Sequence, residues 1–176
     1  MAQADPAKKV LRLSLDETSV AFWDQKRNKG NVAVARGRRA RSRATTKQLR
    51  MHLTHIAIIC DDSDIQVQLP QILLVAGHIL PVGLIDDIRA VLPANVEVWR
   101  ARSGWVNSDV FVQIIERLVR ALAPYRATHQ AVMAMDCFSA HYSEAALRVA
   151  AASGLWLVFI PAGLTWLLQV RSIRTS

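Results

Sequence analysis

The chain has 176 residues, of which 52% are hydrophobic, and this is enough for one domain with a hydrophobic core. Its 22 Lys and Arg against 14 Asp and Glu give a net charge of +8, which favours nucleic acid or another anionic surface, such as an acidic membrane, as a partner. The only cysteines, Cys60 and Cys137, lie far apart without the spacing of a zinc site, and they suggest neither such a site nor a disulfide framework. We expect one globular unit in a reducing compartment.

Two uncharged stretches, residues 65–85 and 149–170, approach the length that spans a bilayer. Their polar residues, glycines and prolines, such as Pro70 and Pro161, favour buried strands joined by turns. The first nine residues show no apolar run behind a basic head, so no secretory signal is predicted. We therefore expect no membrane association.

The first predicted element is a short strand at Leu11–Leu15, where apolar and polar residues alternate up to the acidic pair Asp16 and Glu17. Residues 20–23 could be its hairpin partner. The segment 26–50 then carries ten basic residues and no acidic one. It is either a solvated loop or a phosphate-binding segment. The second hypothesis makes Arg36, Arg38, Arg39, Arg41, Arg43 and Lys47 the candidate nucleic-acid contacts.

Further along the chain, apolar runs alternate with helical patterns. We first predict a buried strand at Leu53–Cys60, a strand within Gln66–Val75 broken at Pro70, a short helix at Asp86–Val91 and a strand at Val96–Ala101. A helix capped by Asn107 or Ser108 then runs to about Leu122. It is followed by a strand at Gln130–Met135 that ends at Asp136, a helix from Ser143 through Ala152, and a strand at Leu155–Ile160. The strand-helix-strand order near the end implies parallel pairing, and hence an α/β sandwich with both sheet faces covered.

Asp16 and Asp136 share one feature, because each directly follows an apolar strand. Carboxylates at strand ends can bind Mg²⁺ or Mn²⁺, the ions that phosphodiester chemistry commonly uses. The alternative is that both aspartates only cap turns. The tryptophans Trp99, Trp105, Trp156 and Trp166 lie in apolar settings that favour core or rim positions over base stacking.

Four segments together carry a resemblance to a known family. They are Leu15 to Ser19, Ser103 to Val106, Met135 to His141 and Phe159 to Gln169. In order and spacing they resemble the DDE superfamily endonuclease domain of pogo, Tigger and jerky-type transposases. The resemblance covers about residues 11–169.

The resemblance implies a ribonuclease H-like fold, a mixed sheet flanked by helices, in which Asp16 is the first catalytic carboxylate and Asp136 the second, both binding Mg²⁺ or Mn²⁺. His141 matches the histidine that follows the family's second aspartate, and it could contact DNA, order the loop or be purely structural. Glu17 also fits the family pattern, but neighbours on a strand point in opposite directions, so we do not expect it to bind the metal.

The chain departs from the family pattern after Gln169. The family continues with proline, leucine and the third acidic residue, leading into a last helix, whereas this chain has Val170, Arg171 and Ser172. Glu144 is an unlikely substitute, because it begins a helix as a partner of the helix dipole. We therefore expect a core without its last helix, with weak metal binding and no efficient cleavage.

The predicted organisation is a tail at 1–9, an endonuclease-like core at 10–170 that includes the basic segment 26–50, and a tail at 171–176. The leading hypothesis is a transposon-derived nuclear domain that binds DNA, takes no small-molecule substrate and has lost catalysis. One alternative is an active Mg²⁺-dependent endonuclease that recruits its third ligand from Glu144 or from another chain. The other is a relic without function, only marginally folded.

Overall fold

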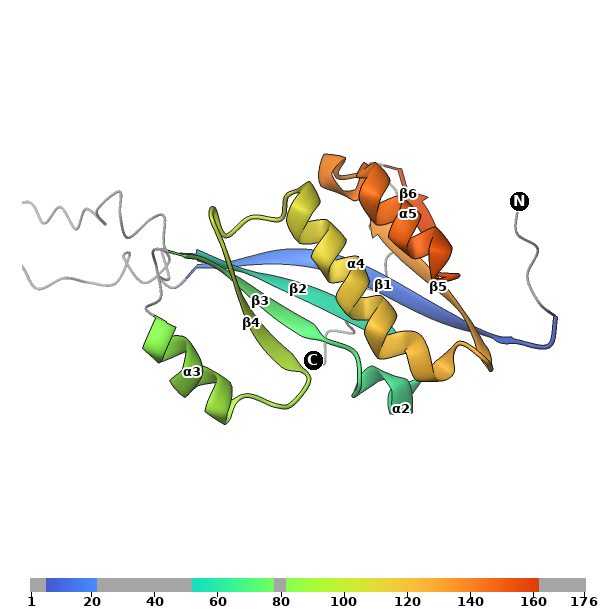
Figure 1. Ribbon diagram of the computed structural model, residues 1–176, viewed down its shortest axis with the longest axis horizontal. Coiled ribbons are helices and arrows are strands. Elements are labelled where there is room, and N and C mark those ends of the chain that lie inside the picture. Colours follow the sequence, from blue (N-terminus) through green and yellow to red (C-terminus); the bar gives the residue numbers. More distant parts are fainter. Residues whose placement is uncertain (1–5, 22–51, 78–81, 162–176) are drawn as a thin grey trace, which may run out of the picture.

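The protein is described here from a computed structural model, which covers residues 6–21, 52–77 and 82–161. These residues form an α/β fold with one six-stranded mixed sheet in the order β4-β3-β2-β1-β5-β6 (Figure 1). The strands are β1 (Lys9–Ala21), β2 (His52–Cys60), β3 (Gln71–Ala76), β4 (Val96–Ala101), β5 (His129–Asp136) and β6 (Trp156–Ile160). The described α-helices are α2 (Ser63–Gln66), α3 (Val82–Val91), α4 (Ser108–Leu122) and α5 (Glu144–Ala152), and the short 3-10 helices are η2 (Ala123–Tyr125) and η3 (Ser139–Tyr142).

The long strand β1 lies in the middle of the sheet and joins its two halves. On one side it pairs antiparallel with β2, which pairs antiparallel with β3, and β4 continues parallel to β3. On the other side β1 pairs parallel with β5, and β5 pairs parallel with β6. The predicted parallel pairing around α5 is therefore confirmed.

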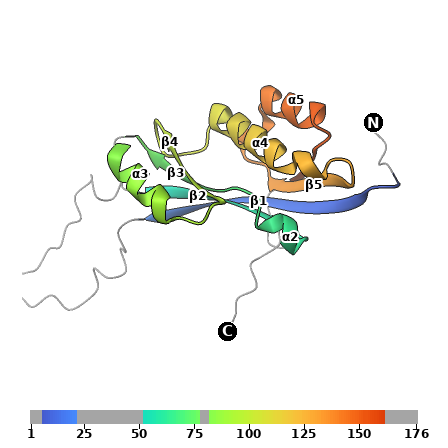
Figure 2. The ribbon, with the colours of Figure 1, turned by 60° about the horizontal axis from the view of Figure 1, so that its bottom comes forward.

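One face of the sheet is covered by α4 and α5, which lie above the strands in Figure 2. Asn107 caps α4 with its side-chain oxygen, 2.9 Å from the Val110 nitrogen, as the sequence predicts. The apolar face of α4 buries Phe111, Ile114, Ile115 and Leu118 completely. These side chains pack against every second residue of the central strands, among them Leu11, Leu13, Leu15, Met133 and Met135.

The opposite face carries a smaller apolar cluster under α3. Val75, Ile85 and Val98 are its buried members, so α3 covers this face only over β3 and β4. Both faces therefore carry helices, as predicted, although unevenly within the described residues. Away from α3, the sheet carries exposed apolar side chains, such as Val158 on β6.

Two local predictions are wrong. β1 does not end at Asp16, because residues up to Ala21 continue to pair with β2, so Val20 lies opposite Leu53 rather than in a hairpin partner of its own strand. The stretch before Pro70 is not a strand either. Asp62 accepts hydrogen bonds from the Asp64 and Ile65 nitrogens and starts α2 there, so the strand begins only at Gln71.

The basic segment 26–50, residues 1–5 of the predicted tail 1–9 and the predicted tail 171–176 lie outside the described residues, as do Trp166 and Val170. Of the other tryptophans, Trp99 and Trp156 are half-buried and Trp105 is 53% exposed. No helix in the described part of the chain is long and apolar enough to cross a membrane.

The core depends on Phe111, which is fully buried between α4 and the sheet. Replacing Phe111 with Ala should lower the free energy of unfolding by about 3–5 kcal/mol, because it leaves a cavity. Urea unfolding measures the change. The control is Val91→Ala. Val91 is the last residue of α3 and is 81% exposed, so this substitution should change the free energy of unfolding by less than about 0.5 kcal/mol. Similar values for both variants would show that this core is not packed as described.

Candidate carboxylate site

The pairing of β1 with β5 brings the two predicted metal-binding residues to the same level of the sheet. The pairing of the two strands ends with Ser14 opposite Ala134, and Asp16 and Asp136 each lie two residues further along their own strand. Paired neighbouring strands are about 4.8 Å apart, so the two aspartates follow the last paired residues of β1 and β5 at the same level of the sheet. This placement follows from the register and needs no contribution from a loop.

Asp16, which lies within β1, differs from the carboxylates that follow β2. The Asp61 carboxylate pairs with the Arg12 guanidinium at 3.1 Å, and Asp62 pairs with Lys9 at 3.1 Å. The hydrogen bond from Lys9, with those from the α2 backbone, lowers the pKa of Asp62. In the described part of the chain, the exposed side chain of Asp16 has no such partner. Among the described residues, no other side chain competes with a ligand for this carboxylate.

Glu17 lies on the other side of β1, with Leu15, as strand alternation predicts. There its Oε1 is 3.1 Å from Nε2 of His141. Nδ1 of the same ring is 3.0 Å from Oδ1 of Asp136 and 3.0 Å from the Asp136 carbonyl oxygen. His141 therefore connects β1 to the end of β5 through two carboxylates.

The surroundings of His141 favour its protonated form. Both ring nitrogens face oxygens of Glu17 and Asp136 that can only accept, so both nitrogens must donate. Burial of the ring opposes the charge, but the hydrogen bond to Glu17 and the contacts with Asp136 outweigh it and raise the pKa of His141. One oxygen of Asp136 thus contacts the His141 ring, while the Asp136 side chain is still 49% exposed.

The ring of His141 is only 1% exposed and is enclosed by aromatic side chains. Its centroid is 4.6 Å from that of Phe111 on α4 and 5.5 Å from that of Phe138. This position orders the loop after β5, which is one of the roles that the sequence suggests. It does not support the predicted contact between His141 and DNA, because a side chain this deeply buried does not face nucleic acid.

The sequence analysis did not predict that Glu17 and Asp136 share a partner. The candidate contacts Arg36, Arg38, Arg39, Arg41, Arg43 and Lys47 lie outside the described residues. Glu144 begins α5 with its side chain 79% exposed and paired with Arg148, so it is not directed at the aspartates. Over residues 6–21, 52–77 and 82–161, no group of three or more His, Cys, Asp or Glu is placed to hold a metal ion.

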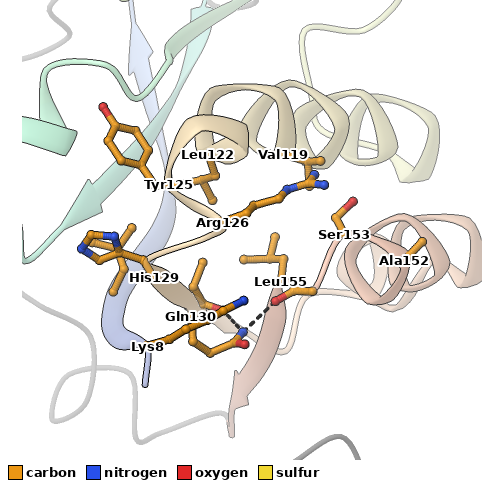
Figure 3. Close-up of a pocket in the computed structure, with 13 residues that line it drawn as sticks. Lys8, Val119, Leu122, Tyr125, Arg126, His129, Gln130, Ala152, Ser153 and Leu155 are labelled. Carbon is orange, nitrogen blue, oxygen red and sulfur yellow. Dashed lines mark hydrogen bonds between the residues drawn. The ribbon is translucent and has the colours of Figure 1, made fainter. Parts of the chain in front are cut away.

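A cavity of about 300 Å³ lies at the opposite end of the sheet, between the ends of α4 and α5 (Figure 3). Lys8, Arg126 and His129 contribute its basic groups, and Leu122 and Leu155 its apolar wall. It opens near the first residues of β5, whereas Asp136 is the last residue of that strand. The cavity is therefore not part of the carboxylate site.

Comparisons with known protein families, with curated proteins and with solved structures found no match to this chain.

Removal of the Glu17 charge should lower the pKa of His141. In Glu17→Gln the strongest attraction for the imidazolium is lost, while burial still opposes its charge. A group whose pKa is raised by folding adds stability below its unfolded pKa, about 6.5, and this stability is lost as the pH rises through the folded pKa. We expect NMR titration of the His141 ring to give a lower pKa in Glu17→Gln, and the pH-dependent loss of stability to begin at lower pH.

The matched control is Glu144→Gln, which removes a carboxylate that is exposed and paired with Arg148. The pKa of His141 should not change in this variant. An unchanged pKa in Glu17→Gln as well would mean that Glu17 does not hold the imidazolium.

Proposed function

We propose that the chain is a transposon-derived DDE endonuclease-like domain that binds nucleic acid and does not cleave it efficiently. The observation that carries this proposal is the register between β1 and β5, in which Asp16 and Asp136 each follow the last paired residues by two positions on neighbouring parallel strands. The sequence resemblance names the same two residues as the first and second catalytic carboxylates.

The sheet supports the ribonuclease H-like part of the proposal. Its central strand carries the first carboxylate, and the second lies at the end of the strand that pairs parallel with it. Carboxylates at the ends of neighbouring strands occur in many α/β folds, so the sheet adds weight to the resemblance without replacing it.

The two aspartates fit a divalent cation, although a weakly bound one. Mg²⁺ and Mn²⁺ prefer oxygen ligands, and Mg²⁺ is often held by only one or two carboxylates, with water completing its shell. Within the described residues, neither the Asp16 carboxylate nor the second oxygen of Asp136 is engaged. When bound, such an ion would activate the nucleophile and stabilise the leaving oxygen of a phosphodiester.

Efficient cleavage needs a third carboxylate, and the family pattern places it where this chain has Ser172. A serine hydroxyl is neutral and a poor substitute for a carboxylate as a magnesium ligand. An ion held by two aspartates is then less well fixed, and small displacements of a reacting centre cost orders of magnitude in rate. Glu144 does not support the alternative of an active nuclease, because it is exposed and paired with Arg148.

The partner that we propose is DNA, contacted through Arg36, Arg38, Arg39, Arg41, Arg43 and Lys47. These cations lie in the segment 26–50, which holds ten of the 22 Lys and Arg of the chain and no acidic residue. Such a segment neutralises phosphates without recognising sequence. A nuclear location follows from this partner as part of the same proposal.

Divalent-ion binding tests the carboxylate pair. We expect isothermal titration with Mn²⁺ to show weak binding to the natural chain and none to Asp16→Ala or Asp136→Ala. The control is Asp61→Ala, whose carboxylate pairs with Arg12 instead. Binding that survives in both aspartate variants would show that the ion lies elsewhere. Mg²⁺-dependent nicking that Asp136→Ala abolishes would instead show an active nuclease.

Nucleic-acid affinity should not depend on the carboxylates. In Asp16→Ala and Asp136→Ala, DNA affinity should stay the same or rise, because negative charge is removed. Replacing the six cations at 36, 38, 39, 41, 43 and 47 with Gln should weaken binding and reduce the slope of log K against log salt, by at most about 5. Fluorescence anisotropy over a salt series measures both. A large loss of affinity in the aspartate variants would contradict the proposal.

A further inference from the structure

The loop between β4 and α4, residues 102–107, is held firmly against the sheet. The Gly104 carbonyl accepts a hydrogen bond of 2.9 Å from the buried hydroxyl of Thr54 on β2. Gly104 has a φ of 71°, and a Cβ there would come within 3.0 Å of the Ala76 nitrogen, so only glycine fits. Val106 is buried beside it, at 7% exposure. The backbone of the loop is thus fixed before any ligand arrives.

The same loop presents Trp105 to solvent, 53% exposed, beside a hollow of about 310 Å³. Phe138, which is 43% exposed and follows β5, lines this hollow too. Two large and partly exposed aromatic side chains therefore line the same hollow, and one of them follows Asp136 by two residues. The remaining lining is Glu17, Ser19, Thr54 and Val106.

A second hollow, of about 470 Å³, lies on the β4 side of the loop and is basic. Arg100 and Arg102 line it together with Arg89, and Asp109 is its only acidic lining residue among those described. Arg89 is held by Asp86 and by the Val98 carbonyl, and Arg100 donates to the Gly77 carbonyl. The exposed Arg102 has no partner of this kind within the described residues. It lies only three residues from Trp105, at most about 11 Å along the chain.

We propose that this loop is a contact site for single-stranded nucleic acid, in which Trp105 and Phe138 stack on an unpaired base and Arg102 neutralises a phosphate of the same strand. This inference rests on the proposed function and adds to it the form of nucleic acid that is bound and the side chains that bind it. It also places the strand beside Asp136.

The chemistry of the two hollows favours this ligand over others. A base offers a π-face to an aromatic side chain only when it is not stacked within a duplex. The adjacent phosphate supplies the negative charge that suits a guanidinium. An aromatic pair alone could bind an apolar partner, and arginines alone could bind any anion. A single strand offers both a base for the aromatic side of the loop and a phosphate for its basic side.

The experiment measures the affinity of the full chain for a single-stranded oligonucleotide and for a duplex of the same length. Trp105→Ala should weaken single-strand binding about five- to a hundredfold, the range seen when one stacked base is lost. Its effect on the duplex should be small. Trp105→Phe keeps an aromatic face and should restore most of the affinity. Thermal unfolding of each variant shows that the loop substitutions leave the fold intact.

For the single strand, Arg102→Ala should reduce the magnitude of the slope of log K against log salt concentration by about 0.7. The matched control is Arg120→Ala, which removes the same charge from the exposed last turn of α4, roughly 20 Å from the loop. The control should leave the slope nearly unchanged. Equal changes in both variants would show that only net charge matters and would overturn the role of Arg102.

The outcomes separate this inference from the function on which it rests. If the natural chain binds no nucleic acid, the proposed function fails, and this inference fails with it. If the natural chain binds, but Trp105→Ala binds single strands as well as the natural chain does, only the loop site is wrong. Equal losses for single strand and duplex would also overturn it, because stacking requires an unpaired base.

Discussion

The parallel pairing of β1 with β5 is the constraint on which the rest of the site depends. The two strands are far apart in the sequence, and nothing local determines where they meet. Their register is set instead by burial, because Leu11, Leu13 and Leu15 must face α4 together with Met133 and Met135. A slip of one residue would turn an apolar set outward and move Asp136 about 3.3 Å along β1. The geometry of the carboxylates is thus a consequence of core packing.

A buried histidine links the two strands at this site. His141 lies between Glu17 and Asp136 and, when protonated, joins the central strand to the end of its neighbour. A buried ion pair is not in itself evidence of stability, because the desolvation of its charges opposes their attraction. Its contribution here is to fix positions. It holds one oxygen of Asp136 and orders the loop that carries Phe138, so the carboxylate site and the aromatic hollow share a support.

Much of the fold follows from local sequence patterns. The periodicity of residues 107–122 and the Asn107 cap predict α4, and the apolar runs before Asp61 and Asp136 predict β2 and β5. The errors arise where pairing or capping overrides a local pattern. β1 continues beyond Asp16 because β2 offers backbone partners there, and Asp62 starts a helix where apolar residues suggested a strand. Sequence patterns also could not reveal that Glu17 reaches His141, 124 residues away.

The measurement that tests the central claim most directly is NMR line broadening by Mn²⁺, which shows where a divalent ion resides. We expect the amide signals around Asp16 and Asp136 to broaden first in the natural chain, and this broadening to disappear in Asp136→Asn. Broadening centred on Asp61 and Asp62, or spread evenly over the acidic surface, would contradict a site formed by the pairing of β1 with β5.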